Sequence, residues 1–457
     1  MECILRLAPK IRVVVTTTEA PSAKKFCEEN TPESLGPRSG PATFPRDSRV
    51  LLFSTLGTRP TKIDRESLLQ SLKTTPELRQ IVDRRNGLYL AVSAISTSLL
   101  LSVELHSPWS SPNLYSDIVD SFWPRDWVQA GSLPYLTAYF EYPPISGLAV
   151  YLARAIGVNL LGFYATFSAV SLIAGAVVAW SCWRIAKSLG RELNSLFFML
   201  PSFLIYGVYN FDLFHVAFVV LSLQSLISKR VDLSAFFLGL GVATKLTSIV
   251  LLPVFLMEVQ GKSARFRYAG EFLAVAGAFN LSFALLNYSS FLQGYQFLAS
   301  YGLEDAWYVW IFQDSSTWNL AKVFGAVVSV VLLLRVYTMK ASLVARSFLA
   351  IAAFLLGTYI YAPQFNLLLL PFVAVLDLQH PATYLWDGFN ALIILTWFLQ
   401  PNSTMAWTWP QFFALLRAFC LAWLCLALLT REGWSLMNWL RALLTRPQGT
   451  TRPPPRI

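Results

Sequence analysis

The stretch Leu114–Pro144 reads LYSDIVDSFWPRDWVQAGSLPYLTAYFEYPP and follows directly after the first long apolar segment of the chain. It sets charged side chains among many aromatic rings, and the charged ones are Asp117, Asp120, Arg125, Asp126 and Glu141. A loop that only connects two membrane helices needs neither so many carboxylates nor so many rings, and loops are where catalytic groups concentrate. We therefore expect this stretch to be a catalytic loop at a membrane surface.

The composition places the chain among membrane proteins. Of its 457 residues, 55% are hydrophobic and 14% are charged, whereas a soluble domain carries about 25% charged residues. The formal net charge is +10, but the basic residues are scattered between apolar segments, which indicates orientation in a bilayer and no nucleic-acid partner. Five cysteines without CxxC spacing and three histidines argue against a zinc site or a histidine-based metal centre.

Three parts follow from the distribution of apolar segments. Residues 1–85 are polar and predict a disordered cytoplasmic tail. Residues 86–430 predict a multi-span transmembrane catalytic domain, and 431–457 a basic cytoplasmic tail. The fold class we expect is an all-α polytopic membrane protein, a bundle of about 11–13 transmembrane helices with a large first outer loop that carries short helices.

The basic residues also predict the orientation. Arg84 and Arg85 precede the first span, and Lys and Arg then recur in alternate loops, so the N-terminus is expected inside. The outer catalytic loop 106–143 contains one arginine, and the second outer loop 288–316 contains no Lys or Arg. This alternation requires that segment 144–157 does not cross. We expect a multi-pass protein of a prokaryotic plasma membrane or the endoplasmic reticulum, with a non-cytoplasmic active face.

Further polar groups are expected at the same outer face. Asn210 and Asp212 occupy a tight turn between two spans, and Lys245 interrupts the apolar run GVATKLTSIVLLP. Glu304 lies in the second outer loop among tryptophans, and Gln364 follows a proline between two later spans. Ionisable residues at membrane depth are costly and favour a functional interpretation, and half-helices that meet at a lysine resemble the broken-helix sites where ligands bind.

Each of these residues also has a plainer interpretation. Lys245 could extend its ammonium group towards the membrane surface. Arg125 could form a structural ion pair with Asp126 or Glu141. Tryptophan and tyrosine at the ends of spans commonly act as interfacial anchors. What favours function is that the polar groups gather on one predicted face.

The order of these pieces resembles the GT-C superfamily of membrane glycosyltransferases, in particular the polyprenyl-phosphate-mannose-dependent mannosyltransferases. The first pieces are Asp117, then Gly131-Ser-Leu-Pro-Tyr135 and Glu141-Tyr-Pro-Pro144. The later ones are Asn210-Phe-Asp212, Thr244-Lys245 before Leu251-Leu-Pro253, and Pro363-Gln-Phe365 before Leu368-Leu-Leu-Pro371. The resemblance covers about residues 86–430. The chain departs from the family in that Asp117 and Asp120 do not form a tight Asp-x-Asp or Glu-x-Asp pair.

The resemblance implies a polyprenyl- or dolichyl-phosphate sugar as donor, with mannose as the hexose, so that no nucleotide-binding domain is needed. It implies an aspartate base, Asp117 or else Asp120, and inversion at the anomeric carbon. Positive charge over the leaving phosphate would come from Lys245, with Arg125 as second choice. The expected substrate-binding residues are Asn210, Asp212, Glu141, Tyr142 and Gln364. No cofactor is expected; a divalent metal is compatible with this chemistry but not required. Membrane lipids surround the protein, and the acceptor stays open between a lipid, a glycan and a protein.

A multi-pass transporter or lipid flippase is the competing class, because broken helices and membrane carboxylates suit it equally well. Many transporters contain internal repeats, with interrupted helices in corresponding positions of two halves. The stretch 117–144 has no counterpart in the second half of this chain. The sequence therefore favours an enzyme.

Overall fold

The computed structural model describes residues 76–434, the first ten of them as backbone alone. All regular elements in this range are helices, joined at one point by an isolated parallel bridge between Glu304 and Ile360. Five helices are long and apolar enough to cross a membrane: α2 (Pro76–Leu105), α5 (Leu160–Ser188), α10 (Lys262–Leu286), α12 (Trp318–Thr338) and α16 (Trp409–Arg431). The predicted all-α class is thus confirmed for the described range, which has the helices of an integral membrane protein.

The other helices are shorter than a full span. The longer ones among them are α4 (Pro144–Ile156), α7 (Asp212–Ile227), α8 (Val231–Thr244), α11 (Tyr288–Ser300), α13 (Leu343–Gly357), α14 (Asn366–Leu376) and α15 (Pro381–Trp397). The brief ones are η1 (Asp117–Phe122), α3 (Asp126–Gln129), η2 (Ser195–Met199), α6 (Pro201–Tyr206), η3 (Leu246–Val250), α9 (Leu251–Glu258), η4 (Trp307–Trp310), η5 (Ser315–Thr317) and η6 (Pro363–Phe365). A short helix is acceptable at membrane depth where protein surrounds it.

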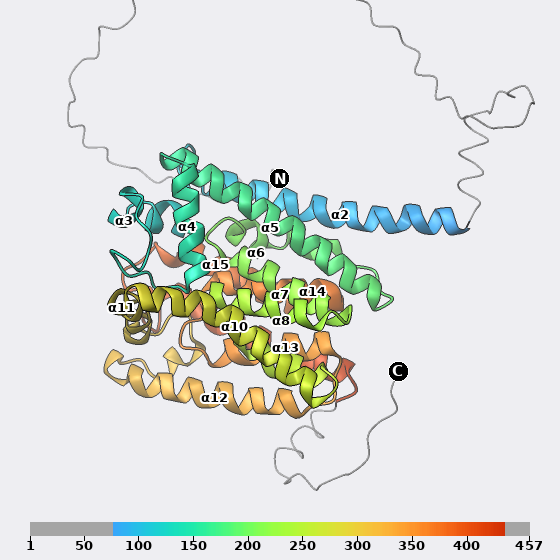
Figure 1. Cartoon of the computed structure of the whole chain (residues 1–457). Coiled ribbons are helices and arrows are strands. Elements are labelled where there is room, and N and C mark those ends of the chain that lie inside the picture. Colours follow the sequence, from blue (N-terminus) through green and yellow to red (C-terminus); the bar gives the residue numbers. More distant parts are fainter. Residues whose placement is uncertain (1–75, 435–457) are drawn as a thin grey trace, which may run out of the picture. The chain divides into compact units, whose positions relative to one another are not determined.

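Helix α14 forms the centre of the packing. Its sequence NLLLLPFVAVL is apolar on every side, and all of its residues are buried. It contacts α5, α7, α13 and α6, so the internal Pro371 lies in protein on all sides. Around it, α2 lies alongside α5, α7 alongside α8, and α12 alongside α13 (Figure 1). Helix α15 packs against α16.

Two boundaries differ from those expected. Helix α2 runs unbroken from Pro76 to Leu105 and so begins inside the predicted tail, because proline suits the first helical position and the residues after it are good helix formers. The rest of that tail, and 435–457 of the basic tail, lie outside the described residues. The second outer loop begins with helix α11. Asn287 is the N-cap of this helix, and its side chain accepts a hydrogen bond from the Ser290 amide at 3.1 Å.

Helix α11 also covers part of the first predicted outer loop, 106–143. Its Gly294 lies directly against the backbone at Phe140, where a Cβ atom would come within 2.2 Å of the carbonyl oxygen. Only glycine allows this approach. The two predicted outer loops are therefore in contact with each other.

Candidate active site

Segments that are far apart in the sequence meet at one end of the helices. Helices α2, α6, α8 and α13 end there, and α7 and α14 begin there. The hydroxyl of Ser146, in the first turn of α4, donates a hydrogen bond to the carbonyl oxygen of Thr244 at 2.7 Å. The Tyr-Pro-Pro segment that precedes α4 is thereby held beside the helix break at Lys245. Different contacts mark the opposite end, where Arg346 pairs with Glu258.

Asp117 begins the short helix η1 and faces this meeting point. Tyr115 donates its hydroxyl to Asp117 Oδ1, and Asn210 donates Nδ2 to Asp117 Oδ2, both at 3.2 Å. Burial among protein groups raises the pKa of the Asp117 carboxyl to about 7, the two hydrogen bonds oppose this shift, and the charges of Asp212 and Glu304 add to it. The side chain stays partly accessible. Asp117 is therefore able to exchange a proton with a bound molecule near neutral pH.

Asp120 has a different environment. It is exposed, and its Oδ2 accepts a hydrogen bond from the Ser116 amide at 2.8 Å. The Ser116 hydroxyl in turn accepts one from the Val119 amide at 3.3 Å. This reciprocal pair resembles a capping box. Asp120 thus shapes the turn that presents Asp117, and between the two aspartates the geometry favours Asp117 as the group at the meeting point.

Replacing Asp120 with alanine is expected to remove this cap. A lost helix cap typically costs about 0.5–2 kcal/mol, so thermal unfolding of the purified protein should begin at a lower temperature. Asp120→Asn keeps an acceptor oxygen in the same place and serves as the matched control. An equal loss of stability in both variants would contradict the capping role.

The turn before α7 connects Asp117 to the lysine. Asn210 Oδ1 accepts a hydrogen bond from the Asp212 amide at 2.8 Å, while its Nδ2 reaches Asp117. Asp212 Oδ1 forms an ion pair with Lys245 Nζ, and both side chains are buried. The Lys245 ammonium also lies 3.8 Å from the centroid of the Phe365 ring. Asn210 therefore joins the aspartate of the first loop to the buried ion pair.

Lys245 lies at a true break in the helix. Helix α8 ends at Thr244, Lys245 is extended with φ −155° and ψ 129°, and η3 follows. An ammonium group has three N–H donors, and Asp212 accepts from one of them. Asp212 Oδ2 and His215 Nε2 are buried without a hydrogen-bond partner within residues 86–434. The surroundings of the ion pair thus offer unused hydrogen-bonding groups to a bound molecule.

Arg125 and Glu141 are bound to each other. The two terminal nitrogens of Arg125 donate to the two carboxylate oxygens of Glu141 at 2.7 and 2.5 Å. The guanidinium carbon also lies 5.2 Å from the centroid of the Phe140 ring. Of the two ion pairs open to Arg125, the structure therefore has the one with Glu141, which connects the middle of the loop to its C-terminal end. Because this bidentate pair uses both terminal nitrogens, Lys245 is the better placed cation for a ligand.

Tyr142 and Gln364 lie in the segments that frame Lys245. The Tyr142 ring packs edge-on against Phe211 with centroids 4.5 Å apart, and its carbonyl oxygen accepts a hydrogen bond from the Tyr135 hydroxyl at 2.5 Å. Gln364 is buried in η6 next to Phe365. The structure thus brings the sequence-derived candidates close to one another, apart from Asp120 and the Arg125–Glu141 pair, whose bonds are made within the loop.

Glu304 was noted in the second outer loop, but no specific role was assigned to it from the sequence. Its amide donates to the Tyr359 carbonyl, and its own carbonyl accepts from the Tyr361 amide, both at 2.9 Å. Burial raises the pKa of the Glu304 carboxyl, and its charge acts on Asp117. The sequence signal that could have identified Glu304 is an acidic pair among tryptophans in an outer loop. Its bridge to 359–361 is a long-range contact that no local sequence pattern reveals.

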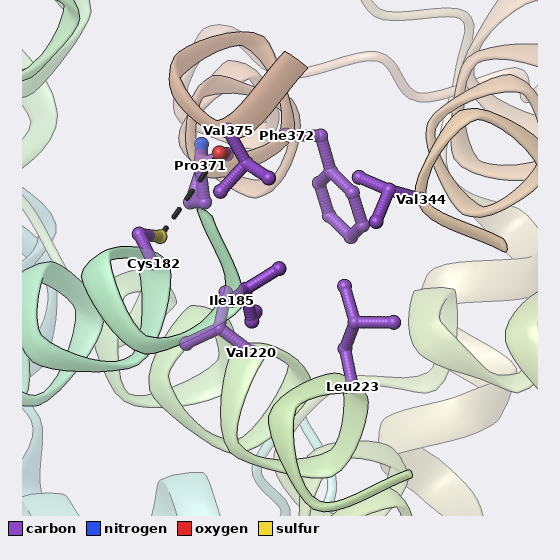
Figure 2. Close-up of a pocket in the computed structure, with 8 residues that line it drawn as sticks. All are labelled: Cys182, Ile185, Val220, Leu223, Val344, Pro371, Phe372 and Val375. Carbon is purple, nitrogen blue, oxygen red and sulfur yellow. Dashed lines mark hydrogen bonds between the residues drawn. The ribbon is translucent and has the colours of Figure 1, made fainter. Parts of the chain in front are cut away.

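An apolar cavity lies elsewhere in the helical core (Figure 2). It lies between α5, α7, α13 and α14 and is lined by Cys182, Ile185, Val220, Leu223, Val344, Pro371, Phe372 and Val375. It leaves no room for a molecule the size of water. This cavity is therefore a feature of core packing rather than a ligand site. Among the described residues, no group of three His, Cys, Asp or Glu side chains is placed to hold a metal ion.

The class of protein has to be defined from the fold and the site, because comparison with known proteins does not identify it. No protein-family model matches the chain, and no curated protein matches it significantly. The described chain is an all-helical protein with five helices able to cross a membrane. At one end of its helices it carries a cluster of Asp117, Asp212, Glu304 and Lys245, whose charges act on one another.

Proposed function

We propose that the protein is an integral membrane glycosyltransferase of the GT-C type. It moves a hexose, mannose in the family it resembles, from a polyprenyl- or dolichyl-phosphate donor to an acceptor hydroxyl. The observation that supports this most is that Asp117 and Lys245, 128 positions apart (245 − 117), are joined through Asn210 and Asp212 in one cluster. A base and a cation are the two groups that transfer from a lipid phosphate requires.

The orientation follows from the basic residues. We take the chain as a multi-pass bundle of about 11–13 transmembrane helices, the shorter ones surrounded by protein. Arg346 and Arg431 lie at the end of their helices away from Asp117, and positive charge marks the cytoplasmic side. The cluster then lies at the non-cytoplasmic face, where the lipid-linked donor would enter from the membrane.

The reaction is a single displacement. The acceptor oxygen attacks the anomeric carbon, and the bond from that carbon to the phosphate oxygen breaks, so its electron pair stays on the lipid phosphate. Asp117 takes the proton of the acceptor hydroxyl. The configuration at the anomeric carbon is inverted. No separate acid is needed, because a phosphate ester is already a competent leaving group.

Lys245 has the role of stabilising the leaving phosphate. One of its N–H groups bonds Asp212, and the remaining two are available for phosphate oxygens. The residues that would hold sugar hydroxyls or orient Lys245 and Asp117 belong to the neighbouring segments; they are Asn210, Asp212, Tyr142 and Gln364. The proposed reaction needs no cofactor and no bound metal.

The decisive experiment supplies the donor directly. Purified protein in liposomes, incubated with radiolabelled polyprenyl-phosphate mannose and a total membrane lipid extract, should move the label to a new product. Mannose at the product's new bond should have the inverted configuration. If the donor stays intact but crosses between leaflets, the protein is a lipid flippase and the proposal is wrong.

The pH dependence of transfer is expected to report on Asp117. Because the carboxyl has a pKa of about 7 and a base acts in its ionised form, kcat/KM should rise about tenfold per pH unit at low pH and level off above neutrality. The folded state holds this proton more tightly than the unfolded state, so the Asp117 contribution favours folding at low pH. Protonation of Asp117 therefore does not unfold the protein, and it cannot lower the rate of sugar transfer at pH 5 in that way. A flat profile between pH 5 and 8 would contradict the assignment.

A further inference from the structure

Arg417 of α16 is a fully buried arginine that no other part of the proposed mechanism uses. It donates one terminal nitrogen to Asn390 Oδ1 at 2.7 Å. The other donates to the carbonyl oxygens of Tyr361 at 2.6 Å and Asp305 at 3.2 Å. Its guanidinium carbon lies 3.6 Å from the centroid of the Tyr361 ring. The group is therefore fixed from several sides by two backbone segments and one helix.

These bonds are unusual for a buried cation. A buried charge is normally held by a partner of opposite charge, whereas the acceptors of Arg417 are two backbone carbonyls and an amide. The Asp305 carboxyl is near, but its Oδ1 accepts from Gln411 Nε2 at 3.0 Å and its Oδ2 has no partner within residues 86–434. Asp305 itself has a left-handed backbone with φ 53°, a conformation that costs energy for a residue other than glycine. The bonds of Arg417 help to hold this conformation.

The two carbonyls belong to the segments that form one wall of the active site. Asp305 follows Glu304, whose amide and carbonyl are bonded to 359–361. Tyr361 precedes η6, which carries Gln364 and the Phe365 ring beneath Lys245. Asn390 adds a third bond of this kind, because its Nδ2 donates to the Pro363 carbonyl at 2.9 Å. The planar fork of arginine is suited to two carbonyls at fixed positions, and a lysine ammonium is not.

We propose that Arg417 is a positioning residue that holds Glu304 and the Pro363–Phe365 turn in place beside Asp117 and Lys245. It touches no substrate and acts through the Asp305 and Tyr361 carbonyls. The inference rests on the proposed glycosyl transfer for its kinetic consequence. Its structural consequence, the order of two segments, is independent of which reaction the site performs.

The experiment compares Arg417→Lys with Arg346→Lys in the full-length protein. Both arginines are buried, but Arg346 bonds Glu258 and lies roughly 16 Å along α13 from the end that leads to Tyr361. Hydrogen exchange is measured on peptides that contain 301–306 and 358–365. In Arg417→Lys, the Glu304 and Tyr361 amides should exchange about 10–100-fold faster, while peptides from α5 and α7 exchange as in the wild type, which shows that the variant is folded.

The same two variants separate positioning from general structure in kinetics. Arg417→Lys should lower kcat about tenfold or more through misplaced groups and change KM for the donor far less, whereas Arg346→Lys should leave both near wild type. Faster exchange throughout the chain, or a response equal to that of Arg346→Lys, would overturn the positioning role. If the wild-type protein transfers no sugar, the proposed function fails instead, and the exchange of the two segments still decides what Arg417 orders.

Discussion

Asp117→Asn should lower the rate of sugar transfer by about 10²–10⁴-fold, the usual contribution of a general base. An amide cannot take the acceptor proton, but it has the shape of the carboxylate. Its oxygen can accept from Asn210, and its NH2 group can donate to the Tyr115 hydroxyl oxygen, so both partners of the native carboxylate stay bonded. The fold should therefore persist. Because burial disfavours the charged carboxylate, the neutral amide should leave the unfolding temperature unchanged or slightly higher.

Asp120→Asn provides the matched control for this result. It makes the same chemical change three positions away, on a residue whose carboxylate accepts from the Ser116 amide instead of facing Asn210. Its transfer rate should stay within about tenfold of the wild type, since only the geometry of the turn is affected. If Asp117→Asn transferred at a near-normal rate and Asp120→Asn did not, the base would be Asp120.

Lys245→Met should reduce both protein abundance and transfer, for two separable reasons. Removing the ammonium leaves the Asp212 carboxylate buried without its partner, which typically costs about 3–5 kcal/mol. Adding Asp212→Asn removes that charge, so the double variant should recover most of its abundance. Its transfer per folded molecule should still be about 10²–10³-fold below wild type, because nothing stabilises the leaving phosphate.

Two comparisons isolate the lysine in this experiment. The single variant Asp212→Asn shows how much transfer is lost with Asp212 alone, and the double variant must lie well below it. The second comparison is the pair Arg346→Met with Glu258→Gln, which neutralises an ion pair at the opposite end of the helices and should leave transfer per folded molecule unchanged. If the double variant matched Asp212→Asn, Lys245 would be a structural residue.

Sequence patterns predicted the all-α class that the described residues show, for a physical reason that is visible in particular segments. The apolar run at 366–376 has no polar side to expose, so it can be stable only when buried, and α14 is buried throughout. The interruption at Lys245 predicted a helix break because a charge between two apolar runs must find a partner. The apolar runs did not predict the lengths of the helices. Five helices are long enough for a full span, and the shorter ones depend on neighbouring protein.

The candidate site was predictable to the extent that its residues stand out locally. Asp117, Asn210 and Lys245 are polar groups beside apolar runs, and each was identified in this way. Glu304 and Arg417 were not assigned a role, since their importance lies in bonds to backbone carbonyls of distant segments. A carbonyl acceptor exists at every residue, so no residue type marks the position where such a bond will form.

The dependence of two site segments on Arg417 has a consequence for how the protein is made. Its helix is the last described one, so a ribosome has produced Asp117, Asp212, Lys245 and Glu304 before it reaches residue 417. Chains emerge from the N-terminus at roughly 5–20 residues per second. Several seconds separate the synthesis of residue 304 from that of residue 417. During this time the nascent chain contains the charged groups of the site but lacks the hydrogen bonds of Arg417. Membrane insertion of α16, the last helix among the described residues, is then the step that gives the segments at Glu304 and Tyr361 their final order.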